Sequence, residues 1–314
     1  MDGLVADIGG TNARFQRIEA AAVVDELRLR CRDFSSFEAL CAAVADAGFG
    51  GTRACVAAVA GPVADAAATI TNLGWRLDQQ VMARALGADR GLLLNDFIAV
   101  AHALPTLADG DLIVLGERRP ADPGGLRLVL GPGTGLGVAG LVPIPDGGWL
   151  PLASEAGHTP FAPAGALEME LLASLVRRFG AVSWEHIVSG PGMVNLYGAM
   201  AEVWGATPRT DQPEEIVRLA RQEIDPVCDQ TLVTWVNLLA DVAGNLAVSM
   251  VARGGVYLTG AIAQSLQDEF ARTFRQRFEE RGAMRGLCEA LPTWLITEPD
   301  PGLRGARAVL AALP

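Results

Sequence analysis

Short apolar runs, each closed by glycine or polar residues, recur along the first hundred residues and predict β-strands. Runs of this length that are rich in aliphatic residues and bounded by turn signals are typical of buried strands. The predicted strands are residues 4–7, 13–18, 53–60, 67–71 and 91–94. Apolar residues at helical spacing lie between them and predict helices at residues 37–47, 77–86 and 97–104. Alternating strands and helices indicate an α/β sheet.

The second half of the chain is richer in helical patterns. The spacing of apolar residues predicts helices at residues 166–179, 214–224, 230–253, 266–281 and 303–313. Strands are expected in "GGVYL" and "TWLITE". The turn-rich segments "LPTLADGDL" and "GERRPADPGG" interrupt the alternation of strands and helices, so we expect a domain boundary near them.

One pattern occurs twice. "LVADIGGTNARF" near the N-terminus and "LRLVLGPGTGLGVAGL" after the expected boundary each contain an apolar strand, a glycine-flanked threonine turn and a second strand. Aligning the turns places Gly10 opposite Gly133 and Thr11 opposite Thr134. The two stretches suggest two halves that are built alike. Asp7 aligns with Leu130, so only the first turn is preceded by an acid.

Composition narrows the class of function. The formal charge of −11 at pH 7 argues against a surface for nucleic acid or for an anionic membrane. All 25 basic residues are arginine. P-loop and protein-kinase mechanisms need a lysine on the phosphates, and Schiff-base catalysis needs one as nucleophile, so all three are excluded.

Cysteine usage and hydropathy bear on the compartment. The five cysteines are scattered and never spaced as C-x-x-C, which favours thiols in a reducing compartment over a disulfide or zinc framework. The first twenty residues lack the layout of a signal peptide. No uninterrupted apolar run approaches the roughly eighteen residues that a membrane-spanning helix needs. We therefore expect a soluble cytoplasmic protein without a membrane partner.

Both glycine–threonine turns have the composition of a phosphate-binding site. Successive backbone N–H groups in such a turn attract anions without a side-chain cation. Glycine lets a phosphate approach the backbone closely, and the threonine hydroxyl adds a donor. Asp7, at the end of the first strand, is placed to hold Mg²⁺ directly or through water. A tight hairpin without a ligand is the alternative interpretation of either turn alone.

Asn95 and Asp96 stand where a buried strand ends and an apolar helix begins. Both residue types cap helices, which is one interpretation. The other interpretation is functional, because ligands of open α/β sheets bind at the carboxyl ends of strands. The amino terminus of the helix would keep Asp96 ionised there, able to accept a proton from a substrate hydroxyl.

Further polar residues gather in "SEAGHTPFAP" and "SWEHIVSGPG". Glu155 and His158 lie beside glycine in a predicted loop, which makes His158 the better candidate for chemistry. His102 lies on the predicted helix after Asp96 and is expected to be a surface or packing residue. Glu185 precedes a predicted glycine–proline turn, and a first-turn helix acid is the alternative interpretation of that residue.

Together these motifs resemble the bacterial glucokinase family, in the branch that lacks a zinc-binding cysteine cluster. The resemblance runs nearly end to end and keeps the family's order. It rests on "DIGGTNARF", "AGPV", "TNLGW", "LNDFIAVA", "GPGTGLGVA", "EAGHTPFAP", "HIVSGPGMVNLY" and "DPGLRGA". Eight ordered motifs are a far more specific signal than a single glycine-rich loop.

The resemblance implies the two-domain α/β fold of actin-like ATPases, which is ribonuclease H-like, with a cleft between the domains. A smaller domain would comprise residues 1–106 plus 299–314, and a larger domain residues 107–298. The implied reaction is the first step of glycolysis, transfer of a phosphoryl group from ATP to the 6-hydroxyl of glucose with Mg²⁺. The expected assembly is a homodimer.

The resemblance also implies residue roles. Asp96 would be the catalytic base that faces the sugar 6-hydroxyl. The other sugar hydroxyls would bind Asn95, Glu155, His158 and Glu185. Asp7 would hold Mg²⁺, through water. The ATP phosphates would meet the two turns at Ala6, Asp7, Ile8, Gly9, Gly10, Thr11, Gly133, Thr134 and Gly135.

Two positions depart from the family's pattern, and two alternatives remain. Ala156 stands where a second glycine is usual, and its methyl group would crowd the sugar pocket. Ala261 replaces a glycine near the expected adenosine side, which bears on nucleotide affinity. The alternative functions are a kinase for another hexose, such as mannose or fructose, and a catalytically silent sugar sensor of the same fold.

Overall fold

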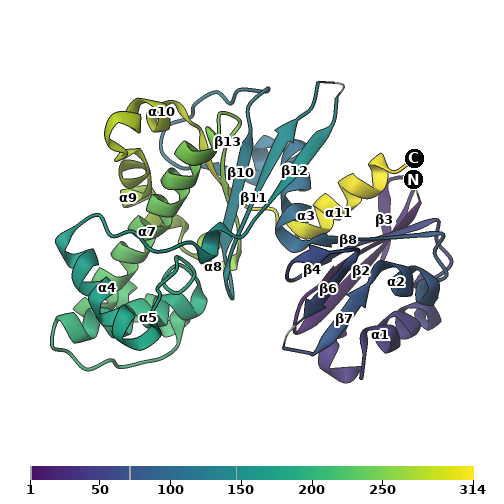
Figure 1. The fold of residues 1–314 in the computed structure, drawn as a ribbon, viewed down its shortest axis with the longest axis horizontal. Coiled ribbons are helices and arrows are strands. Elements are labelled where there is room, and N and C mark those ends of the chain that lie inside the picture. The colour runs from purple at the N-terminus through teal and green to yellow at the C-terminus, as the bar shows by residue number, and fades with distance from the viewer. Residues whose placement is uncertain (1, 71, 146) are drawn as a thin grey trace. The chain divides into compact units, whose positions relative to one another are not determined.

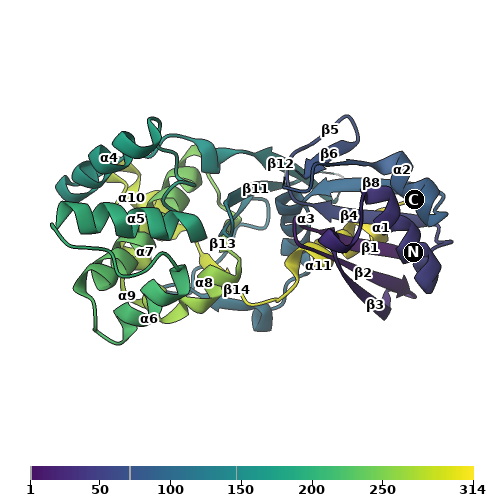
Figure 2. The same ribbon diagram turned by 90° about the horizontal axis from the view of Figure 1, so that it is seen from below.

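Two sheets with the same strand topology organise the chain, as Figures 1 and 2 show for a computed structural model that describes residues 2–70, 72–145 and 147–314. The first sheet has the order β3 (Ala22–Arg30), β2 (Asn12–Glu19), β1 (Gly3–Ile8), β4 (Ala54–Val59) and β8 (Arg90–Asn95). The second has the order β12 (Trp149–Ser154), β11 (Leu136–Pro143), β10 (Arg127–Pro132), β13 (Gly255–Leu258) and β14 (Thr293–Ile296), with β9 (Leu112–Val114) beyond it.

Strand directions correspond as well. In each sheet the strand before the glycine–threonine turn pairs antiparallel with the strand after it. On its other side, the strand before the turn pairs parallel with β4 in the first sheet and with β13 in the second. These strands in turn pair parallel with β8 and β14. The α/β prediction is confirmed. The sheets lie in separate compact units, a smaller one of Met1–Ala108 with Glu298–Pro314 and a larger one of Asp109–Thr297.

The smaller unit covers both faces of its sheet with helices. Along β1, Leu4 and Ala6 are buried with residues of α1 (Phe37–Val44) and α2 (Gln79–Leu86). Val5 faces the other way and is buried with residues of α11 (Pro301–Ala312), because successive strand side chains point to opposite faces. A three-stranded sheet of β5 (Val63–Ala64), β6 (Ala67–Ile70) and β7 (Trp75–Asp78) completes the unit.

Helices α3 (Asp96–Ala103) and α11 lie side by side, as Figures 1 and 2 both show. Their close approach depends on Gly305, since a Cβ atom at this position would overlap the carbonyl oxygen of Ala99. The C-terminal helix therefore fixes the position of the helix that begins at Asp96.

The larger unit packs most of its helices around one long apolar helix, α7 (Pro226–Met250). The others are α4 (Ala166–Phe179), α5 (Gly190–Val203), α6 (Pro213–Arg221), α8 (Ala261–Ser265), α9 (Gln267–Glu279) and α10 (Arg285–Ala290). By length and composition α7 resembles a membrane-spanning helix, but 72% of its most apolar stretch is buried inside the structure. It is accordingly the core helix of this unit.

Several elements differ from the sequence predictions. The helix expected from residue 77 begins at Gln79, because Asp78 ends β7 and its carboxylate accepts two N–H groups as the N-cap. The glycine–proline turn expected after Glu185 is instead the first turn of α5. Pro191 has no N–H group, but at this position of a helix that costs no hydrogen bond. The strand expected at residues 67–71 is β6, and Thr71 lies outside the described residues.

Candidate functional site

The first glycine–threonine turn joins β1 to β2 in the smaller unit. The Gly9 N–H donates to the Asn12 carbonyl at 3.0 Å and closes the turn. The Asn72 side chain donates to the Gly10 carbonyl at 3.1 Å, and a Cβ atom on Gly10 would overlap that side chain. Neither Gly9 nor Gly10 has a positive φ, so glycine serves close approach here rather than a left-handed backbone.

This turn lines a pocket of about 550 Å³ that is also lined by two arginines, Arg14 and Arg28. Arg14 Nη2 donates to Asp7 Oδ2 at 2.8 Å, and Nη1 pairs with Asp300, which precedes α11. Burial opposes the charge, yet the hydrogen bonds to Asp7 and Asp300 raise the pKa of Arg14 above its ordinary value. Sequence reasoning missed Arg14, although the hairpin register that pairs it with Asp7 follows from the turn position.

Asn95 is the N-cap residue of α3, so the capping interpretation describes its geometry. Its Oδ1 accepts the N–H groups of Phe97 and Ile98 at 3.0 and 3.1 Å. Its Nδ2 donates to the Gly61 carbonyl at 3.0 Å and to Asp96 Oδ1 at 2.9 Å. The amide thereby orients the carboxylate of Asp96, the first residue of the helix.

Asp96 lies at the carboxyl end of the parallel strands, as the sequence predicts for that motif. Its pKa is raised to about 6, mainly by burial of the carboxyl group and to a smaller extent by the nearby charge of Asp7. Hydrogen bonds from Phe97 N–H and the Asn95 amide act in the opposite direction. The expectation that the helix amino terminus keeps Asp96 ionised therefore omits the effect of burial, which moves the pKa of this carboxyl group toward neutrality.

Three predicted polar residues meet in the larger unit. His158 Nε2 lies 3.8 Å from Glu155 Oε2, and His158 Nδ1 lies 3.9 Å from Glu185 Oε1. These separations exceed hydrogen-bond length, so the three side chains keep donors and acceptors available for a ligand. Their side chains remain 67%, 60% and 34% exposed for Glu155, His158 and Glu185.

Ala156 belongs to the buried core of the larger unit and is 9% exposed. Its methyl group packs among core residues, so the structure gives no support to the prediction that it crowds a sugar pocket. His102 is half-buried on α3, and burial lowers its pKa, which fits the packing role expected from the sequence.

The second turn joins β10 to β11 in the larger unit. Gly133 N–H donates to the Gly135 carbonyl at 2.7 Å, and the Gly133 carbonyl accepts the N–H of Gly190, the first residue of α5, at 2.8 Å. A pocket of about 530 Å³ opens beside Thr134. It is lined by Gly133, Thr134, Gly190, Pro191, Val194, Asn195, Asp211, Pro213 and Ile262. Ala261 borders a neighbouring pocket of about 360 Å³.

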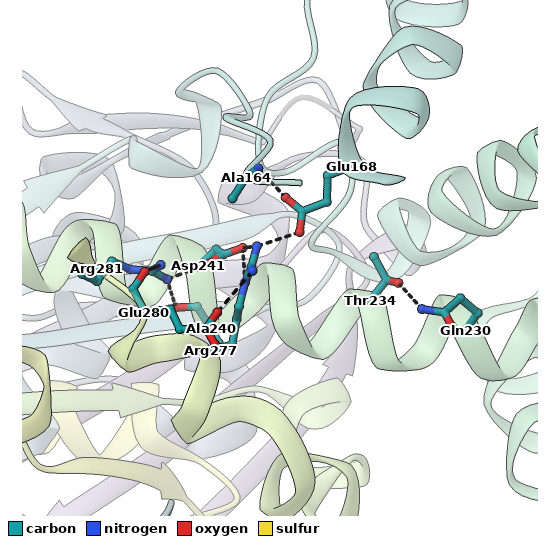
Figure 3. Close-up of polar contacts among 9 residues, drawn as sticks. All are labelled: Ala164, Glu168, Gln230, Thr234, Ala240, Asp241, Arg277, Glu280 and Arg281. Carbon is teal, nitrogen blue, oxygen red and sulfur yellow. Dashed lines mark hydrogen bonds and ion pairs between the residues drawn. The ribbon is translucent and has the colours of Figure 1, made fainter. Parts of the chain in front are cut away.

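A partly buried charge network, drawn in Figure 3, lies just after the segment that carries Glu155 and His158. Glu168 of α4 accepts the Ala164 N–H at 2.6 Å and pairs with Arg277 of α9 at 2.7 Å. Arg277 also donates twice to Asp241 of α7, at 2.7 and 2.9 Å. The network joins three helices to Ala164, the residue that directly follows the "EAGHTPFAP" segment.

No group of three or more His, Cys, Asp or Glu side chains forms a ready-made metal site among residues 2–70, 72–145 and 147–314. In phosphoryl transfer, one or two carboxylates and the substrate phosphates hold Mg²⁺ rather than an all-protein cage. Asp7, 30% exposed and facing the turn pocket, fits one such carboxylate.

Two sheets of one topology, each with a glycine–threonine turn, define a phosphotransferase of the actin-like ATPase fold. The family model described as Glucokinase matches residues 4–313, and the chain belongs to the glucokinase family.

Individual relatives agree with this membership. The chain is 40% identical to a glucokinase of Marinobacter nauticus, over 98% of this chain and 96% of that protein. It resembles the crystal structure of a glucokinase from an Antarctic psychrotroph with a TM-score of 0.88 and 33% identity, over 99% of both chains. A ROK family glucokinase from Streptomyces griseus, in complex with glucose and AMPPNP, has a TM-score of 0.65 and 19% identity over 98% of this chain and 99% of that one, and shows the shared fold alone.

Proposed function

We propose that the protein transfers the γ-phosphoryl group of ATP to the 6-hydroxyl of D-glucose. Glucose phosphorylation is the activity that names its family and its relatives, and a protein of the same fold binds glucose and AMPPNP. One observation carries the assignment of the base. Asp96 lies at the carboxyl end of a parallel strand, near enough to Asp7 to feel its charge, and its pKa of about 6 is close to neutrality.

The proposed chemistry uses this chain's own groups as follows. Asp96 accepts the proton of the 6-hydroxyl while that oxygen bonds to the γ-phosphorus and ADP leaves. The N–H groups of Gly10 and Thr11, and those of Thr134 and Gly135 in the second turn, would offset charge on the phosphate oxygens, whereas the N–H groups of Gly9 and Gly133 close their own turns. Mg²⁺, associated with Asp7 through water, would neutralise part of the triphosphate charge. Arg14 holds the Asp7 carboxylate in place.

Sugar recognition is proposed for four residues. In the larger unit Glu155, His158 and Glu185 would each bind hydroxyls, and in the smaller unit the Asn95 amide would do so. A site built from hydrogen bonds discriminates strongly, because an epimer leaves buried polar groups without partners. We therefore propose glucose as the preferred hexose.

ADP release in the presence of glucose, mannose, fructose or galactose tests the proposal. We expect glucose-dependent release that stops when EDTA removes Mg²⁺, and kcat/KM for galactose at least about 100-fold lower than for glucose. Preference for mannose or fructose would make the chain a kinase for another hexose. Calorimetric glucose binding without ADP formation would make it a sugar sensor.

The pH dependence should report Asp96. Because burial raises the pKa of this acid to about 6, its basic form is populated only above that pH. We expect kcat/KM to fall about tenfold for each pH unit below 6 and to level off above it. Initial rates between pH 5 and 8.5 at saturating Mg²⁺ measure this profile. A profile that stays flat from pH 5 to 7 would contradict the assignment of the base.

We also propose a cytoplasmic homodimer. The five cysteines are buried free thiols, which suits a reducing compartment, and the acidic surface charge disfavours anionic membranes. Sedimentation velocity of the purified chain distinguishes a dimer from a monomer of 32.9 kDa.

A further inference from the structure

The carboxylate of Glu185 faces two candidate sites at once. Its Oε2 accepts the N–H of Leu136 at 2.9 Å, at the end of the second glycine–threonine turn. Its Oε1 faces His158 Nδ1 at 3.9 Å, within the group of polar side chains proposed to bind the sugar. One side chain therefore touches both the turn proposed for phosphate and the segment proposed for glucose.

Backbone hydrogen bonds join the same segments around Glu185. The Glu185 N–H donates to the Gly157 carbonyl at 2.9 Å, in the turn of residues 156–158. The Glu185 carbonyl accepts the Ser189 hydroxyl at 2.8 Å. Gly190 N–H, one residue further, donates to the Gly133 carbonyl at 2.8 Å. A displacement of Glu185 therefore acts on the turn and the sugar segment together.

We propose that Glu185 couples sugar binding to nucleotide binding within the larger unit, an inference that rests on the function proposed above. A sugar hydroxyl bound to Oε1 restricts the rotation of the side chain and keeps Oε2 on the Leu136 N–H. The turn is then ordered before the nucleotide arrives, so less conformational entropy is lost when it binds. By linkage, a bound nucleotide strengthens glucose binding by the same factor.

Two glycines of this turn provide a matched pair of variants. A Cβ atom on Gly135 would overlap Glu185 Oε2 and lie 3.0 Å from its Cδ, whereas a Cβ atom on Gly133 would meet no atom within 4 Å. Neither glycine has a positive φ, so alanine fits both backbones. Gly135→Ala therefore displaces the Glu185 carboxylate, and Gly133→Ala adds the same methyl group to the same turn without touching it.

Isothermal titration calorimetry with glucose, in the absence and presence of saturating Mg²⁺–AMPPNP, measures the coupling. In the unsubstituted protein we expect AMPPNP to tighten glucose binding by a factor of about 5–150, the usual range for linked sites. In Gly135→Ala we expect glucose alone to bind about tenfold more weakly, the size of a lost hydrogen bond to a charged group. The tightening by AMPPNP should fall at least several-fold. In Gly133→Ala, glucose affinity without AMPPNP should stay within about twofold.

The reverse titration, AMPPNP without sugar, supplies the second measurement. Glu185→Gln keeps an oxygen that can accept the Leu136 N–H, whereas Glu185→Ala has none, so we expect only Glu185→Ala to weaken AMPPNP binding. The proposal is overturned if Gly135→Ala keeps the glucose affinity and coupling of the unsubstituted protein. It is also overturned if Gly133→Ala loses glucose affinity equally, or if both Glu185 variants bind AMPPNP alike. Failure of the unsubstituted protein to bind glucose would instead refute the proposed function.

Discussion

Replacing Asp96 by asparagine should lower kcat about 10²–10⁴-fold, the usual contribution of a general base. Asparagine keeps the shape of the side chain and an oxygen that can accept the Phe97 N–H, which the carboxylate accepts at 2.9 Å. It cannot take up the proton of the sugar hydroxyl. A coupled assay of ADP release at saturating glucose and ATP measures the loss.

The control for this variant is Asp89→Asn. Asp89 is exposed and precedes β8, whereas Asp96 follows it, so the same substitution at the opposite end of one strand should leave kcat within about twofold. Glucose binding by Asp96→Asn, followed by calorimetry, should persist. Because the pKa of Asp96 is raised from 3.8 to about 6 in the folded state, its contribution to stability is lost as the pH rises through this range. At pH 8 the ionised carboxylate therefore adds no stability that asparagine would remove, and we do not expect the variant to have a lower Tm. A kcat within tenfold of the unsubstituted protein would refute the role of Asp96.

Replacing Asp241 by alanine should destabilise the larger unit by about 3–5 kcal/mol, because it removes a buried carboxylate that two partly buried guanidinium groups share. Arg277 donates twice to Asp241 Oδ2, and Arg281 donates to Oδ1 at 2.7 Å, as Figure 3 shows. The Asp241 side chain is only 4% exposed. The tight fit extends to Gly244, where a Cβ atom would overlap Arg281 Nε. Thermal unfolding should show Tm lower by on the order of 10 °C.

Glu289→Ala is the matched control for Asp241→Ala. Glu289 pairs with Arg285 at 2.7 Å on α10, but the two side chains are 44% and 63% exposed. Exposed pairs contribute about 0–1 kcal/mol, so Tm should move by no more than about 2–4 °C. Equal losses of Tm in the two variants would show that burial of the Asp241 network does not strengthen it.

The sequence predicted best those parts of the fold in which local pattern and tertiary environment agree. Helix α4 matches its predicted bounds, residues 166–179, because one apolar face and a following glycine define it. Strand β3 has no sequence prediction, since most of its residues are exposed at the sheet edge and no apolar alternation marks it. Helix α5 begins at a glycine–proline–glycine sequence that local rules assign to a turn.

The candidate site shows the same division. Asp7, Asp96 and the two turns follow from motifs at strand ends, and His158 is near Glu155 because both lie in one short segment. The proximity of Glu185 to that segment depends on backbone pairing between residues 185 and 157, which no local pattern encodes. Likewise, the pairing of Arg14 with Asp300 joins residues 286 positions apart and depends on where the C-terminal helix packs.

The strand order of the smaller unit also has a metric consequence. Strands β1 and β8 are separated only by β4, and hydrogen-bonded neighbours in a sheet stand about 4.8 Å apart. Strand β1, which carries Asp7, and strand β8, which leads into Asp96, are thus held about 10 Å apart by main-chain bonds alone. In the proposed mechanism, a substitution in a surrounding loop would therefore leave the backbone spacing between the carboxylate assigned to Mg²⁺ and the carboxylate assigned as base unchanged.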